Sequence, residues 1–146
     1  MSTSTAERRV GTQDVIEKLL AERQSLLVMY CELAGMETKQ DRAGEDELLQ
    51  RFCELLVDYS AFAHFEIYER IIDGRERRSK VVDAARKAYP RIAEATEVAV
   101  DFNDKYDANE HALDLTGLYS DLNRLGEELA VRIEMEDQII GALIGR

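Results

Sequence analysis

The chain contains 146 residues, of which 45% are hydrophobic and 34% are charged, and its formal net charge is −11. This length fits one domain that buries a core without disulfides or a structural metal. The negative charge disfavours direct binding to nucleic acid or to an anionic membrane, and it favours a basic partner such as a DNA-binding protein. Solubility alone is the competing explanation of the acidic composition.

The cysteines and the first residues of the chain indicate a reducing compartment. Cys31 and Cys53 fall within apolar helical patterns, so we expect both to be small core residues and not a disulfide or metal pair. The polar segment 1–12 lacks the apolar stretch of a signal peptide, and no apolar run is long enough to span a membrane. These features predict a cytoplasmic protein.

Two long helices are predicted in the first half of the chain. The first covers about residues 13–34, because leucine and isoleucine recur there at helical spacing and Gly35 follows. The second covers about residues 45–72 and is bounded by a glycine on each side. Both helices are amphipathic, so each has one face that must pack against a neighbour.

The second half predicts two more helices. One begins near Ser79 and is expected to bend or restart at Pro90, since proline disrupts a helix interior. The other covers about residues 118–143. No segment alternates with period two, so we predict an all-α fold: an antiparallel four-helix bundle with a kinked or interrupted third helix. It would form a single domain over 13–146, preceded by a flexible arm over 1–12.

The sequence offers little for catalysis or metal binding. Di-iron helical bundles use Glu-x-x-His pairs, but the only histidines, His64 and His111, follow Ala61 and Ala108 at that spacing. Phosphate-binding loops and nucleophile elbows are also missing from the sequence. We therefore expect no enzyme, no metal site and no cofactor.

Charged residues interrupt two of the apolar stripes. Arg132 and Glu136 lie one turn apart at the centre of the last helix's apolar face, and Arg23 lies at the centre of the first helix's. Long charged side chains are rarely buried unless paired, so we predict a buried polar cluster of these three residues with His64 and Tyr68. The alternatives are arginines that reach solvent from a core edge, a pocket for a small ligand, and a half-buried His64–Tyr68 pair with no such role.

The second helix carries a further face outside its leucine stripe. At about 100° per residue, Asp58, Phe65, Glu69 and Ile72 fall within one narrow sector. An apolar centre with a charged rim is typical of a protein interface. The competing explanation is that another segment of the chain covers this sector.

Two runs in this helix carry a family resemblance. Residues 52–59 read F-C-E-L-L-V-D-Y, and residues 64–70 read H-F-E-I-Y-E-R. These runs resemble the F-C-x-x-L-V-D-Y and H-F-x-[IV]-Y-E segments of the Rsd/AlgQ family of bacterial anti-sigma regulators. Weaker matches extend the resemblance over roughly residues 15–142.

The resemblance implies a four-helix bundle that binds the primary sigma factor of RNA polymerase, mainly at sigma's C-terminal helix-turn-helix domain. On this basis Asp58 would accept a hydrogen bond from the partner, Phe65 would be the apolar anchor, and Glu69 would steer association. Ala61 stands where the family usually has serine. With Ile72 from the same sector, these residues form the predicted partner-binding set.

The predicted function is therefore that of an anti-sigma factor, with the primary sigma factor as partner and a monomer as the favoured state. The alternative is a helical adaptor or regulator of another cytoplasmic protein, including one that acts as a homodimer. The altered segment 60–63, which reads S-A-F-A where the family usually has L-S-A-G, would favour this alternative.

Overall fold

The computed structural model describes residues 5–73, 76–109 and 112–145, and these residues form helices and connecting loops only. The elements in chain order are α1 (Thr5–Gly35), the short 3-10 helix η1 (Met36–Thr38), α2 (Glu45–Ala63), the π-helical segment η2 (His64–Tyr68), α3 (Glu69–Ile72), α4 (Ser79–Lys105) and α5 (Leu118–Leu143). The all-α prediction is confirmed. Searched over the same residues, none of the helices combines the length and apolar content that crossing a bilayer requires.

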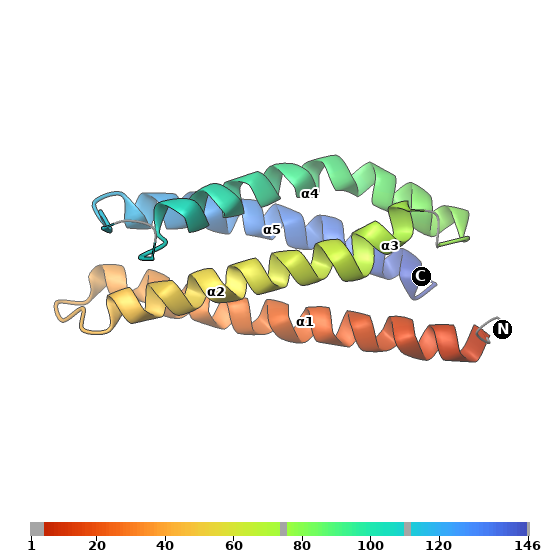
Figure 1. Ribbon diagram of the computed structural model, residues 1–146, viewed down its shortest axis with the longest axis horizontal. Helices are drawn as coiled ribbons and strands as arrows, with labels where there is room; N and C mark the ends of the chain where they lie inside the picture. The colour runs from red at the N-terminus through yellow and green to blue at the C-terminus, as the bar shows by residue number, and fades with distance from the viewer. Residues whose placement is uncertain (1–4, 74–75, 110–111, 146) are drawn as a thin grey trace.

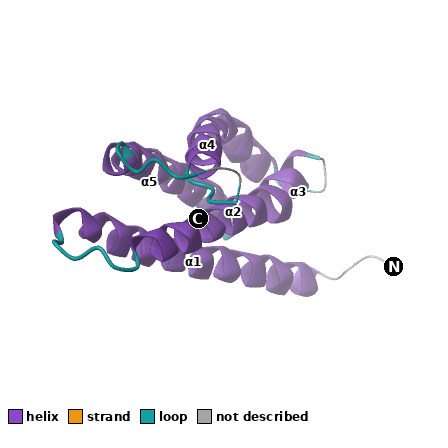
Figure 2. Ribbon diagram, turned by 60° about the vertical axis from the view of Figure 1, so that its left-hand side comes forward, coloured by secondary structure: helices purple, strands orange, loops and turns teal. Residues whose placement is uncertain are grey.

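The long helices lie lengthwise beside one another (Figure 1). The most extensive contacts join α4 to α5 and α1 to α2, and α2 also contacts α4. In Figure 1, α1 and α4 run in one direction along the long axis while α2 and α5 run in the other. Figure 2 shows the α4–α5 pair lying across the α1–α2 pair, so the core lies between two helical layers.

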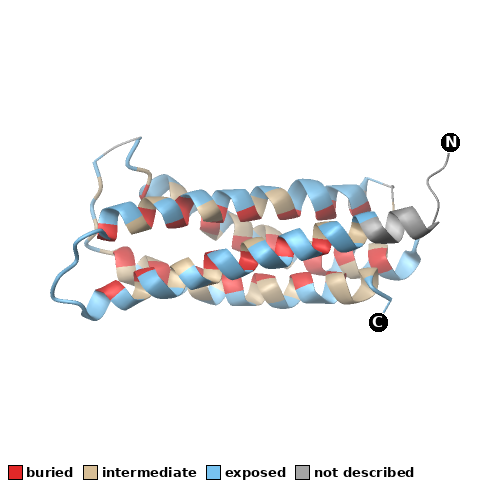
Figure 3. Cartoon of the chain, turned by 90° about the horizontal axis from the view of Figure 1, so that it is seen from below, coloured by how far each residue is buried: buried red, intermediate tan, exposed pale blue. Residues whose placement is uncertain are grey.

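A strict repeat of buried positions explains how these helices pack. The buried residues of α5 are separated by gaps of four, three, four, three, four and three positions, and those of α4 follow the same sequence of gaps. This average spacing of about 3.5 residues keeps one seam facing a neighbouring helix, as in coiled coils. The buried positions accordingly line the inner sides of the helices (Figure 3).

The third predicted helix continues through its proline without a break. α4 continues from Ser79 to Lys105 with Pro90 inside it, so of the two expected outcomes, a kink or an interruption, the interruption does not occur. Pro90 is exposed, and the carbonyl group that loses its hydrogen bond, at Arg86, also belongs to an exposed residue. Water can hydrate that carbonyl, which removes much of the cost of an internal proline. The bend at this position stays a prediction.

The other helix boundaries were predicted with mixed accuracy. The expected limits of α5, 118–143, are confirmed. α1 begins at Thr5 and not near Gln13, because Gly11 is the only strong helix breaker among residues 5–12. Residues 1–4 lie outside the described residues, and the flexibility of the arm over 1–12 stays a prediction, as does the single domain over 13–146.

The two cysteines lie in different environments, one buried and one exposed. Cys53 is buried as predicted, whereas Cys31 is exposed on the outer side of α1, and both thiols are free. The placement of Cys31 in the core is therefore wrong. The inner face of α1 is lined by Leu26 and Leu33, and Cys31 lies two positions before Leu33, about 200° away around the helix axis.

A close contact between α1 and α5 gives a test of this packing. The Tyr30 hydroxyl donates to the Leu122 carbonyl at 3.0 Å, and a Cβ atom added at Gly126 would lie 2.1 Å from the same hydroxyl oxygen. We expect Gly126→Ala to lower the free energy of unfolding by about 1–3 kcal/mol, since the ring must move out of a packed site.

Urea unfolding followed by circular dichroism measures the change. Gly141→Ala is the matched control on the same helix, because nothing lies within 4 Å of its added Cβ atom. Replacing an unobstructed helical glycine by alanine should stabilise by up to about 1 kcal/mol. Equal effects of the two substitutions would contradict the close packing of Tyr30 on Gly126.

Candidate functional site

The centre of the molecule holds a buried carboxylate with donors from several helices. Glu136 on α5 is 1% exposed, and it accepts hydrogen bonds from Tyr68 at 2.5 Å, from the Tyr59 hydroxyl, from Arg23 at 3.2 Å and from Arg132 at 3.3 Å. Both carboxylate oxygens are therefore used. The donors come from α1, α2, η2 and α5, so one side chain joins four elements.

The two arginines make further contacts. Arg132, which is 1% exposed, donates to the Thr96 hydroxyl of α4 at 3.0 Å and stacks over the Tyr59 ring at 5.3 Å. Arg23 forms a second ion pair with Asp137 at 2.8 Å. Because charges of both signs meet in the same region, each buried charge has a compensating partner.

Burial and charge together fix the protonation of the cluster. Burial foremost, and then the charge of Glu136, raise the pKa values of Tyr59 and Tyr68 well above the ordinary tyrosine value. Both hydroxyls therefore keep their protons and remain donors at neutral pH. Burial lowers the pKa of Arg132, but Glu136 together with Tyr68 and Tyr59 more than offsets this effect, so the pKa is raised and the guanidinium stays charged.

The cluster brings together four of the five residues that the sequence suggested: Arg23, Tyr68, Arg132 and Glu136. His64 was wrongly included, because its side chain is exposed. Tyr59 was not predicted as a member of the cluster. The available signal was its hydroxyl, which needs a hydrogen-bond partner once buried.

The carboxylate at the centre of the cluster is fully engaged in hydrogen bonds. It is occupied by four donors, and within the described part of the chain no three His, Cys, Asp or Glu side chains are placed to hold a metal ion. The Arg23 Nε atom is buried without a hydrogen-bond partner among the described residues. The contacts that are made hold helices together.

The predicted partner-binding face lies on the continuous α2–η2–α3 segment. Phe65 is 60% exposed, the largest exposed fraction among the large hydrophobic side chains described as exposed. Asp58 and Ala61 on α2 and Glu69 on α3 are also exposed, while the side chain of Ile72 lies outside the described residues. The described segments leave Phe65 uncovered, but its role in binding stays a prediction.

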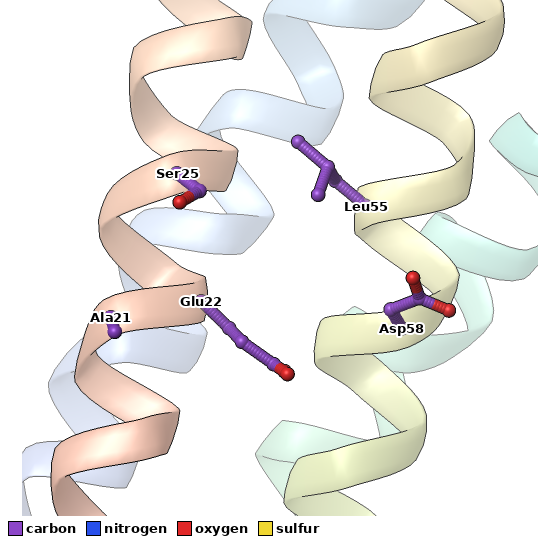
Figure 4. A pocket seen from close by; sticks show the side chains of 5 residues that line it. All are labelled: Ala21, Glu22, Ser25, Leu55 and Asp58. Atoms are coloured by element: carbon purple, nitrogen blue, oxygen red, sulfur yellow. The ribbon is translucent and has the colours of Figure 1, made fainter.

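A shallow hollow of about 180 Å³ lies beside Asp58, between α1 and α2. Figure 4 shows Glu22 reaching from α1 toward α2, with Leu55 and Asp58 on the opposite wall and Ala21 and Ser25 completing the lining. The Glu22 Oε2 atom is buried without a partner among the described residues.

The hollow adds a second carboxylate, that of Glu22, beside Asp58 of the predicted partner-binding face. Burial and the Asp58 charge raise the pKa of Glu22, although Lys18 acts in the opposite direction. Glu22 was not predicted, because its position on α1 alone gives no sign that it faces Asp58 on α2. A basic group brought to this edge would meet two carboxylates.

An all-helical chain with paired internal charges and an uncovered aromatic side chain among acids has the features of a helical protein-binding module. The chain belongs to the Rsd/AlgQ family: residues 1–144 match the family model described as "Regulator of RNA polymerase sigma(70) subunit, Rsd/AlgQ". The resemblance seen in the sequence is therefore confirmed.

Curated relatives agree with this assignment. A protein of Yersinia enterocolitica named "Regulator of sigma D" is 34% identical over 141 residues, which cover 94% of this chain and 84% of the relative. A protein of Enterobacter sp. strain 638 with the same name is 35% identical over 143 residues, with the same coverage. No solved structure matches the chain.

The central carboxylate gives a test of the cluster. Glu136→Ala leaves two buried arginines without their shared partner, so we expect the free energy of unfolding to fall by about 3–5 kcal/mol. Denaturant titration of the variant and the wild-type protein measures this loss. Glu134→Ala is the control, because Glu134 is exposed on the same helix. Similar losses from the two substitutions would show that the Glu136 contacts contribute nothing special.

Proposed function

We propose that this protein is a non-catalytic, cytoplasmic anti-sigma factor that binds the primary sigma factor of RNA polymerase, mainly at its C-terminal helix-turn-helix domain. Membership of the Rsd/AlgQ family and the names of the relatives support a sigma factor as the partner. The observation that carries the choice of surface is the exposure of Phe65 beside acidic side chains.

The chemistry of this face suits a basic DNA-reading domain. Phe65 offers an apolar anchor, with the His64 ring packed edge-on against it at 4.9 Å. Asp58 and Glu69 supply negative charge on either side of it along the chain. Domains that contact DNA carry basic side chains for the phosphates, so they complement both this face and the net charge of −11.

Binding at such a domain would inhibit sigma by covering the surface with which sigma contacts promoter DNA. A helix-turn-helix domain covered by this protein cannot place its recognition helix in the promoter's major groove. The protein would then withhold sigma from promoters in a stoichiometric complex that needs no cofactor and no direct contact with nucleic acid. Its scaffold on this proposal is a monomeric antiparallel four-helix bundle bent at Pro90. The alternating helix directions in Figure 1 support the antiparallel arrangement.

One feature favours a second candidate function. Ala61 is exposed between Asp58 and Phe65 along the helix and lacks the hydroxyl group usual at this position in the family. The neighbouring Phe62 is covered by the Lys18 ammonium group at 4.7 Å from its ring centre. A face altered in this way would also suit a different cytoplasmic protein or a second copy of this chain, so that the protein acts as an adaptor or regulator of that partner.

Isothermal titration calorimetry with the C-terminal domain of the cognate primary sigma factor tests the first proposal. We expect saturable binding near one-to-one. Phe65→Ala should weaken it by about 2 kcal/mol or more, which is roughly 30-fold in Kd, since a desolvated aromatic anchor is lost. Val100→Ala, which removes another exposed apolar side chain on α4, should leave Kd unchanged.

The outcomes separate the alternatives. Binding that Phe65→Ala does not weaken keeps the partner but moves the contact away from η2. Absence of binding to this domain and to full-length sigma would reject the anti-sigma proposal in favour of another partner. Sedimentation of the protein alone tests the homodimer, which would appear as a concentration-dependent rise in mass.

A further inference from the structure

Two tyrosines reach the same carboxylate from positions that a regular helix would place on opposite sides. Tyr59 and Tyr68 are nine residues apart, which at about 100° per residue is half a turn beyond two full turns. Yet both hydroxyls donate to Glu136. The helix between them must therefore rotate less than a regular α-helix does.

The π-helical segment η2, His64–Tyr68, supplies this difference. Its backbone includes a bond from the Glu69 N–H to the His64 carbonyl, five residues apart and not four. Each turn of this kind holds more residues than an α-helical turn, so every residue rotates less about the axis. Tyr68 is thereby brought to the inner side, where it is 2% exposed.

The same five residues divide sharply between the outside and the inside. His64, Phe65 and Glu66 are consecutive and exposed, whereas Ile67 and Tyr68 are consecutive and buried. Only two residues lie between the proposed anchor Phe65 and Tyr68, so the two side chains share one short stretch of backbone. A contact that holds one of them also restrains the other.

We propose that the hydrogen bond from Tyr68 to Glu136 is a positioning contact, which maintains the π-helical turn and thereby fixes the direction in which Phe65 projects toward the partner. The part of this inference that concerns the partner rests on the proposed function. Tyr68 touches no partner; it acts through the backbone of η2. π-helical turns are rare without tertiary support, and they occur often at functional sites.

The physical basis is a competition between two helix registers. Without the bond to Glu136, regular α-helical hydrogen bonding is the register of lower free energy for this segment. The wide turn then closes to the ordinary number of residues per turn. The residues that follow then rotate by about one position, or about 100°, relative to α2. Phe65 lies at the start of this change and Glu69 lies after it, so the direction of Phe65 relative to Glu69 changes with the register.

A matched pair of variants tests the inference. Tyr68→Phe and Tyr59→Phe each remove one hydroxyl donor from Glu136, and both positions are almost fully buried, but only Tyr68 belongs to η2. Amide hydrogen exchange of residues 64–69, measured by mass spectrometry or NMR, reports on the turn without any partner. Calorimetry with the sigma C-terminal domain reports on its consequence for binding.

We expect Tyr68→Phe to accelerate exchange over 64–69 by about tenfold relative to the rest of α2, and to weaken sigma binding by about tenfold. Tyr59→Phe should change both by less than about threefold, although it removes a donor from the same carboxylate. A Gly141→Ala background keeps Tyr68→Phe folded if it is too unstable alone.

Two results would overturn the inference. Exchange over 64–69 that stays unchanged in Tyr68→Phe would show that the turn does not depend on this bond. Equal weakening of sigma binding by the two variants, in proportion to their loss of stability, would reduce Tyr68 to a structural residue. Failure of the wild-type protein to bind sigma would reject the proposed function instead, and the exchange comparison would still decide whether Tyr68 holds η2.

Discussion

The structure depends on one buried carboxylate. Glu136 receives donors from α1, α2, η2 and α5, and Arg132 extends the cluster to α4 through Thr96. An apolar seam with a repeat of about 3.5 residues gives helices affinity for one another but permits sliding by a turn. A polar contact that must be satisfied in the interior removes that freedom. The cluster therefore specifies one alignment of the helices more than it adds net stability, since apolar residues could often replace a buried ion pair without loss.

The inner and outer faces of the α2–η2–α3 segment are consequences of a single backbone feature. The wide turn at His64–Tyr68 brings Tyr68 to Glu136, and the same five residues include the exposed Phe65. The core and the proposed interface are therefore not independent parts of the molecule. In a family whose relatives are named for sigma regulation, divergence at the surface is thus limited by what the core can hold.

Sequence reasoning succeeded where regular α-helical geometry holds. The limits of α5, the exposure of Phe65 and the meeting of Arg23 with Glu136 all follow from spacing and from the need of buried charges for partners. It failed to predict the π-helical turn at His64–Tyr68, and it wrongly placed the exposed His64 in the cluster. The hollow at Glu22 was also missed, because it depends on how two helices sit together, which no single helix encodes.

The different environments of the two cysteines give the molecule a selective chemical reactivity. Burial raises the pKa of the Cys53 thiol to about 12, so its thiolate is scarce and reagents cannot reach it. Cys31 is exposed on the outer side of α1. A thiol-directed fluorophore should therefore attach at one position without engineering, and an oxidant would join two molecules back to back through α1.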